Sequence, residues 1–300
     1  MRKTKLSELL KFKPAKGPGY EISPKFYLSV MAARMPLPSI RQIVEPKGAD
    51  GAVIGFGVPM AGDKEDLEHP MERGAYVIAS LDRKTVIRGL VISKEEAGFN
   101  PEGFLRSDRA LLLSEEAKSR MASTWMLVQL TFESFDPGVH SATRLMYEVA
   151  ARLAELSGGL VADPVSEVYK MPSEVLSPIG TDGFAVQDLV AVHSRVIGSG
   201  FGLFTLGMQK FGLPEFEIAG VGDAQGQAAA RLLLGLCQGV LRTKQLTVGD
   251  SVGSKRSAFR IAAGGLDRGQ WEGILVLEVI PENTEDVNSV LARWDEETNG

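Results

Sequence analysis

The stretch DLVAVHSRVIGSGFGLFTLGMQKFGLPEFEIAGVGDAQGQAAARLLLGLCQGV, residues 188–240, decides the fold that we expect for this chain. Its first part alternates in polarity up to Ile197 and then meets Gly198-Ser199-Gly200, a pattern that predicts a hairpin. A glycine-closed turn follows within residues 205–215, and Pro214 ends any helix there. One more strand and the most apolar helix of the chain come next. This order of elements indicates an α+β scaffold.

The glycines of this stretch also suggest a dinucleotide loop, which needs Gly-x-Gly-x-x-Gly opening directly into a helix. Here Gly198, Gly200 and Gly202 place the third glycine one residue early, and the residues that follow look extended. A turn with positive φ explains these glycines better. We therefore expect no nucleotide and no other cofactor at this position.

Composition excludes several classes of function. The chain has 300 residues, a formal net charge of −5 and one cysteine. The acidic balance argues against nucleic-acid binding, and one cysteine cannot build an intrachain disulfide framework. No stretch approaches the length of an apolar membrane span, and the N-terminus lacks the apolar core of a secretory signal. The sequence thus predicts a cytoplasmic protein without membrane insertion.

We expect three parts along the chain: a basic arm at 1–19, an α+β domain at 20–121 and a second α+β domain at 122–300. Each domain is expected to carry mixed or antiparallel sheets packed with helices, which gives two α/β sandwich-like halves. Within the second domain, an apolar strand, a long amphipathic helix and a short strand predict a β-α-β unit over 125–162. The arm can form a short amphipathic helix that docks on its own domain or on a partner, and its docking residues would be Lys3, Lys5, Leu6, Leu9 and Leu10.

The candidate functional surface lies on the same central stretch. Alternation along the strand at 189–197 places His193 and Arg195 on one face. Polar residues of the following segment join them as candidates: Thr205, Glu215 and Glu217. No acid lies near His193 in sequence to orient it as a base, so we assign no catalytic residue. The acidic loop at 62–72 contains a histidine, but its spacing matches no metal motif, so no metal site is expected.

The segment Thr205–Glu217 reads Thr-x-Gly-Met-x-x-Phe-Gly-x-Pro-Glu-x-Glu and resembles the motif of a bacterial family, the domain of unknown function 4261. An earlier strand–helix–Gly-Gly–strand–Asp-Pro segment, residues 127–164, is similar as well. The resemblance covers roughly residues 122–280. It implies an α+β domain without an established enzyme activity, and related families occur near toxin–immunity or secretion-system genes.

These observations predict a protein that binds another protein or serves as a subunit of a larger assembly, without catalysis of its own. Few histidines, one cysteine and no phosphate or metal motif leave little from which to build an active site. The alternative is a hydrolase or transferase with a cleft beside the hairpin at 188–217. There His193 and Arg195 would work with acids such as Glu215 or Glu217.

Overall fold

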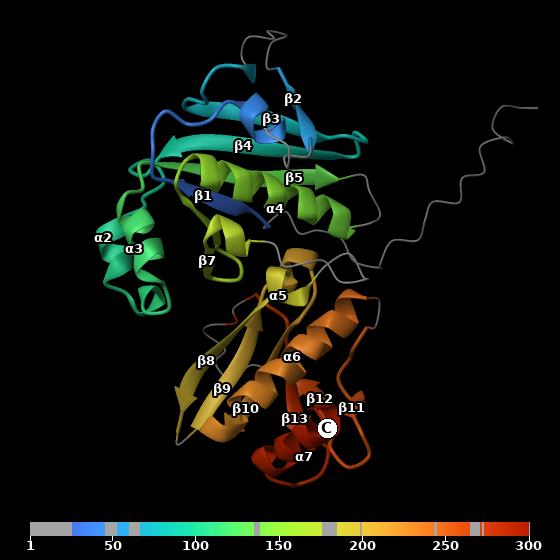
Figure 1. Ribbon diagram of the computed structural model, residues 1–300. Helices are drawn as coiled ribbons and strands as arrows, with labels where there is room; N and C mark the ends of the chain where they lie inside the picture. Colours follow the sequence, from blue (N-terminus) through green and yellow to red (C-terminus); the bar gives the residue numbers. More distant parts are fainter. Residues whose placement is uncertain are drawn as a thin grey trace, which may run out of the picture.

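The computed structural model describes residues 26–45, 53–59, 67–134, 139–175, 185–198, 200–242, 245–264, 271 and 273–299. Over these residues the chain has an α+β fold built on two mostly antiparallel sheets. Figure 1 shows the first sheet above the second, with the short helix α5 (Val186–Leu189) in the region between them. The α+β expectation is therefore confirmed.

The first sheet has seven strands in the order β2-β3-β4-β5-β1-β6-β7. Their bounds are β1 Leu28–Ala32, β2 Gly55–Val58, β3 Gly74–Ser80, β4 Thr85–Ser93, β5 Met126–Ser134, β6 Leu160–Asp163 and β7 Val168–Lys170. Strand β1 is central and all five of its residues are buried, because both of its faces are covered. It pairs antiparallel with β5 on one side and with β6 on the other.

Helices cover the two faces of this sheet unequally. On the inner face, the amphipathic helix α4 (Val139–Leu156) packs on β1, β5 and β6, and α1 (Ile40–Val44) packs on β2. On the outer face, helices α2 (Pro101–Leu105) and α3 (Glu115–Ala122) build a small lobe whose core reaches the β1 and β6 strands. Strands β3 and β4 have no comparable helix contact within the described part of the chain.

The second sheet has six strands in the order β11-β12-β13-β10-β9-β8. Their bounds are β8 Ala191–Ile197, β9 Gly200–Leu206, β10 Glu215–Val221, β11 Ser251–Gly253, β12 Ala258–Ala263 and β13 Val276–Pro281. Strands β8 and β9 form the hairpin that the central stretch predicts. Helices α6 (Gly226–Leu241) and α7 (Val287–Asn299) pack on this sheet and on each other.

The two sheets divide the chain at a different place from the one we expected. Strand β5 pairs with β1 and with β4, so residues 126–134 complete the first sheet. The expected boundary between residues 121 and 122 therefore falls inside one sheet, and the change of sheet comes between β7 and β8. The predicted β-α-β unit is present as β5, α4 and β6, but β1 inserts between its two strands. Sequence order gives no sign of that insertion.

One apolar core connects the two halves. A single cluster of packed buried side chains includes Val30 and Leu153 of the first half together with Phe216 and Leu233 of the second. Contacts of this kind define one contiguous core. Among the helices that the structure describes, none combines the length and apolarity that crossing a membrane requires.

Candidate functional site

The turn after β9 is built around a buried carboxylate. Thr205 donates its hydroxyl hydrogen to Glu215 at 2.7 Å, and the backbone N–H groups of Gly207 and Gln209 donate to the same carboxylate at 2.8 and 3.1 Å. Thr205 also accepts the N–H of Phe216 at 2.8 Å. Glu215 thus ties the 3-10 turn Met208–Phe211 to the start of β10.

Burial dominates the electrostatics of Glu215. The loss of water raises its pKa to about 7, although the three hydrogen bonds and the nearby ammonium of Lys210 act in the opposite direction. Burial disfavours the charged form of a carboxyl, whereas donated hydrogen bonds favour it. The surrounding groups account for a structural role, because the donors come from Thr205 at the end of β9 and from the backbone of the turn that follows.

Lys210 joins the two halves of the molecule from the same turn. Its fully buried ammonium contacts the Asp163 carboxylate, lies 3.3 Å from the Tyr147 hydroxyl and donates to the Leu189 carbonyl at 2.6 Å. The ammonium also lies 5.1 Å from the centroid of the Phe26 ring. Burial lowers the pKa of Lys210, and Asp163 opposes that shift.

Asp163 is satisfied on both of its oxygens. Tyr147 donates to one of them at 3.0 Å, and the backbone N–H groups of Val165 and Ser166 donate to the other at 3.2 and 3.1 Å. Burial beside this carboxylate raises the pKa of Tyr147. Buried charges persist in proteins when they are paired and hydrogen-bonded in this way.

The candidate residues His193 and Arg195 lie on the edge strand β8. The Nε2 atom of His193 is 2.8 Å from the carbonyl oxygen of Ser166, and its ring stacks on Phe204 with 5.8 Å between centroids. The guanidinium of Arg195 lies 5.8 Å from the centroid of the same Phe204 ring. Both side chains therefore pack on an aromatic residue of the neighbouring strand.

Glu217 lies on the same sheet face but is covered. Trp271 donates its indole N–H to Glu217 at 3.2 Å and meets Phe204 edge to face at 5.4 Å. On the next strand Glu278 pairs directly with Glu217, and burial together with the charge of Glu217 raises the pKa of Glu278.

The structure corrects the expectation of a five-residue functional surface. Thr205, Glu215 and Glu217 are fully buried, so they cannot be part of an exposed surface. Thr205 alternates with Phe204 along β9, and it therefore lies on the side of the sheet opposite to His193, which pairs with Phe204. Alternation within one strand shows which residues share a face, but it cannot show which face another element covers. The docking arm at 1–19 lies outside the described residues.

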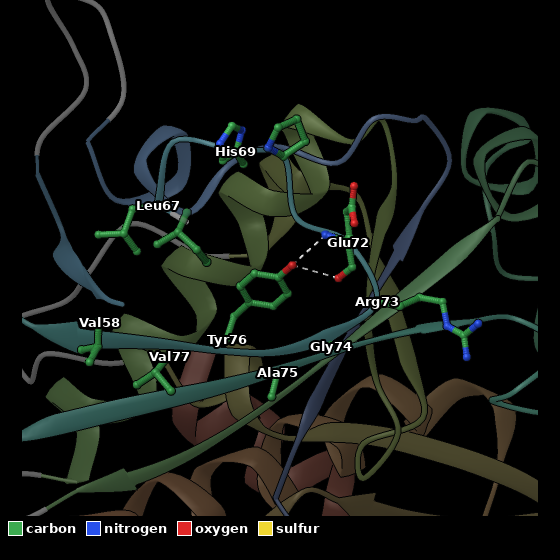
Figure 2. A pocket seen from close by; sticks show the side chains of 11 residues that line it. Val58, Leu67, His69, Glu72, Arg73, Gly74, Ala75, Tyr76 and Val77 are labelled. Atoms are coloured by element: carbon green, nitrogen blue, oxygen red, sulfur yellow. Dashed lines mark hydrogen bonds between the residues drawn. The ribbon is translucent and has the colours of Figure 1, made fainter. Parts of the chain in front are cut away.

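A different site appears at the far edge of the first sheet, where strand β2 ends. A cavity of about 480 Å³ opens there, and Figure 2 shows His69 and Leu67 above it and Val58, Tyr76 and Val77 below it. A second cavity of about 510 Å³ lies on the other side of Leu67, toward α1. Leu67 and Ile40 line both cavities.

Tyr76 is held in a fixed position beside the first cavity. Its hydroxyl accepts the backbone N–H of Glu72 at 2.7 Å and donates to the carbonyl of the same residue at 3.0 Å (Figure 2). In the described part of the chain, the Glu72 carboxylate has no ion pair or hydrogen-bond partner. Nearby arginines are already paired, Arg41 with Glu45 and Glu68, and Arg73 with Glu96.

The cavity continues onto an apolar sheet face. Cross-strand pairing places Val58 beside Val77 and Ala75 beside Leu90, all on the side opposite to the buried Ile78. Leu90 is 44% exposed and Val58 is 38% exposed. The outer face of β2, β3 and β4 is therefore apolar and partly open.

One pattern in the sequence could have predicted this site. The run Gly74-Ala75-Tyr76-Val77-Ile78-Ala79 has apolar residues at both alternating positions, which is typical of a strand covered on two faces. A strand of that composition with one open face marks a surface that could receive a partner. The histidine of the acidic loop, His69, does line the cavity, but residues 60–66 lie outside the described part.

Within the described residues, no three His, Cys, Asp or Glu side chains lie close enough together to hold a metal ion. Comparison with known proteins found no matching family model, no matching curated protein and no matching solved structure. The resemblance at Thr205–Glu217 therefore stays a prediction, and the geometry of the chain itself has to carry the functional proposal.

Proposed function

We propose that this chain is a protein-binding subunit without catalysis of its own, and that it binds its partner through the outer face of β2, β3 and β4. The observation that carries the proposal is the apolar character of this face, which the lobe of α2 and α3 leaves open. A contiguous apolar patch on a protein surface often marks a site where another protein binds.

The composition of the face supports a protein partner. Val58, Val77 and Leu90 are apolar side chains of this face, and Arg88 lies directly opposite Val77 on the neighbouring strand β4. Interfaces between proteins commonly combine an apolar centre with a polar rim. Val58 and Val77 also line the cavity, so a protruding side chain of the partner could insert beside them.

No specific observation favours the alternative of a hydrolase or transferase at the hairpin. Among the described residues, the polar contact of the His193 ring is with the Ser166 carbonyl rather than with a carboxylate that could orient it as a general base. Glu215 is enclosed by donors of its own turn, and Glu217 by Trp271.

The test is affinity capture with a variant of the apolar face. Immobilised full-length protein and its Leu90→Arg variant are incubated with extract of the cells that carry the gene, and bound proteins are quantified by mass spectrometry. The wild type should retain one partner near equal stoichiometry, and Leu90→Arg should lose it because a charge at the centre of an apolar interface remains desolvated.

Leu112→Arg is the matched control. Leu112 is 92% exposed in the lobe of α2 and α3, so the same substitution adds the same charge away from the proposed face. This variant should retain the partner. Capture of no stoichiometric partner by the wild type, or equal loss in both variants, contradicts the proposal.

A further inference from the structure

The cavity at the end of β2 points to a specific kind of ligand. We propose that it binds an extended peptide segment of a partner that pairs along the part of the β3 edge where the structure describes no neighbouring strand, and that places a lysine or arginine side chain beside the Glu72 carboxylate and the Tyr76 ring. This inference rests on the proposed protein-binding function and names the part of the partner that is recognised.

Strand β2 pairs with a shorter part of β3 than strand β4 does. Strand β2 pairs with residues 77–80 of β3, whereas β4 pairs with β3 from Gly74 onward. Residues Gly74, Ala75 and Tyr76 therefore have β4 on one side and no described strand on the other. The backbone groups of such an edge can pair with an added strand, which is a common mode of peptide recognition.

The cavity lies along that edge. Its walls include Ala75 and Val77 from the outer face and Tyr76 and Leu67 from the inner face. Side chains of an added strand alternate between the two faces of a sheet. One side chain of the peptide would therefore enter the space beside Tyr76 and Leu67, while its neighbours would lie on the apolar outer face.

The carboxylate of Glu72 determines which charge on a ligand this cavity favours. Glu72 has no partner for its carboxylate in the described part of the chain, whereas Arg41 and Arg73 are matched by glutamates. Figure 2 shows the Glu72 side chain close above the Tyr76 hydroxyl. A carboxylate beside an aromatic ring recognises a cationic side chain, through a charge-assisted hydrogen bond and through attraction to the ring face. The same unmatched negative charge disfavours a phosphate or a carboxylate ligand.

The geometry also argues against a catalytic role for this cavity. Figure 2 shows the side chains of His69 and Glu72 apart from each other at the upper side of the cavity, and no interaction is drawn that joins them. The Tyr76 hydroxyl is engaged with the Glu72 backbone. A cavity wall with a fixed tyrosine and a carboxylate that has no partner among the described residues is suited to binding a cationic side chain.

The experiment uses a phage-displayed library of random nonapeptides selected on the immobilised full-length protein. Selected sequences should share a lysine or arginine with valine, isoleucine or threonine at alternate positions around it. The strongest peptide is then labelled and its affinity measured by fluorescence anisotropy. Glu72→Gln should weaken it about tenfold, as removal of one partner of a charge pair does. Glu102→Gln, which changes an exposed acid of α2, should leave the affinity unchanged.

Strand addition is tested on the peptide. Methylation of alternate backbone nitrogens on the side that faces β3 should abolish binding, and methylation of the intervening ones should not. Equal affinity for Glu72→Gln, equal effects of the two methylation patterns, or selection of peptides without a basic residue would each overturn the inference. These outcomes leave the capture experiment with Leu90→Arg untouched, so the inference can fail while the proposed function stands. Selected peptides that match residues 1–13 of this chain would assign the groove to the chain's own arm and would overturn the assignment to a partner.

Discussion

At Glu215, burial and hydrogen bonding act against each other. Three donors hold its carboxylate, yet burial raises its pKa to about 7. In the unfolded chain a glutamate titrates near ~4.3. Between these two values the folded protein holds a proton that the unfolded chain has released.

Glu215 should therefore make stability depend on pH. Its contribution is fully present below about pH 4.3 and is lost as the pH rises through about 7, because the folded state binds the extra proton. The Glu215→Gln variant cannot titrate, so its free energy of unfolding should change less than that of the wild type across this window. The difference should be on the order of 3–4 kcal/mol, at about 1.4 kcal/mol per pKa unit. Urea unfolding at several pH values measures it.

The control for this prediction is Glu102→Gln, which removes an exposed carboxyl with the same chemistry. Its pH profile should follow that of the wild type. A constant difference between wild type and Glu215→Gln from pH 4 to pH 8 would show that Glu215 stays ionised throughout, held by its three donors.

At the scale of elements, the turn between β9 and β10 depends on two glycines with different surroundings. Gly207 has φ 136°, and a Cβ atom there would lie 2.4 Å from the Leu189 carbonyl oxygen. Gly212 has φ 63° and open space where a Cβ would point. The first glycine allows close approach of two chain segments, whereas the second only closes the turn.

Alanine at these two positions should separate close approach from backbone strain. Gly212→Ala should cost about 1 kcal/mol, the strain of a left-handed residue with a side chain. Gly207→Ala should cost about 3 kcal/mol or more, because the Leu189 backbone must also move. Thermal and urea denaturation of the two variants provide the comparison. Equal costs would mean that the contact with Leu189 relaxes without penalty.

At the scale of the whole molecule, Lys210 and Asp163 connect two halves that share one core. Lys210 belongs to the turn of the second half, while Asp163 and Tyr147 belong to the first. A buried ion pair adds little net stability compared with apolar residues, but removing one partner leaves a buried charge uncompensated. The pair therefore fixes how the two sheets meet.

The variant Lys210→Met should lose about 3–5 kcal/mol of unfolding free energy, since Asp163 remains buried without its cation. The double variant with Asp163→Asn should recover part of that loss. Lys118→Met, which removes a partly exposed ammonium beside Glu115, should change stability by about 0.5 kcal/mol or less. Circular dichroism and tryptophan fluorescence in urea should give coincident transitions, because the core is continuous. Separate transitions for the two signals would contradict that view of the molecule.

Much of the fold follows from local patterns. The hairpin β8–β9, the helix α6 and the β-α-β unit at 125–162 are readable because side-chain periodicity and glycine turns act over a few residues. What periodicity cannot give is pairing between distant strands. Strand β1 inserts between β5 and β6, and this moved the change of sheet far beyond the boundary that we expected.

The candidate site shows the same limit more sharply. The sequence placed His193 and Arg195 together, and these two do lie on one aromatic neighbour, Phe204. The sequence also placed the acids Glu215 and Glu217 on the candidate surface. In the structure the turn encloses Glu215, and Trp271 covers Glu217. The cavity at the end of β2 needs residues from α1, β2, β3 and the segment 67–73, which no local pattern connects.

The sequence by itself determined the α+β class, the central hairpin and the turn that the glycines and Pro214 define, because these depend on backbone preferences and short-range periodicity. The tertiary structure alone decided which polar residues became buried, where the two sheets separate and which part of the β3 edge has no described strand beside it. Those outcomes depend on contacts between segments far apart in the chain. Such a contact forms only when the loop between the two segments closes, which costs conformational entropy, and no short stretch of sequence shows which contacts repay that cost.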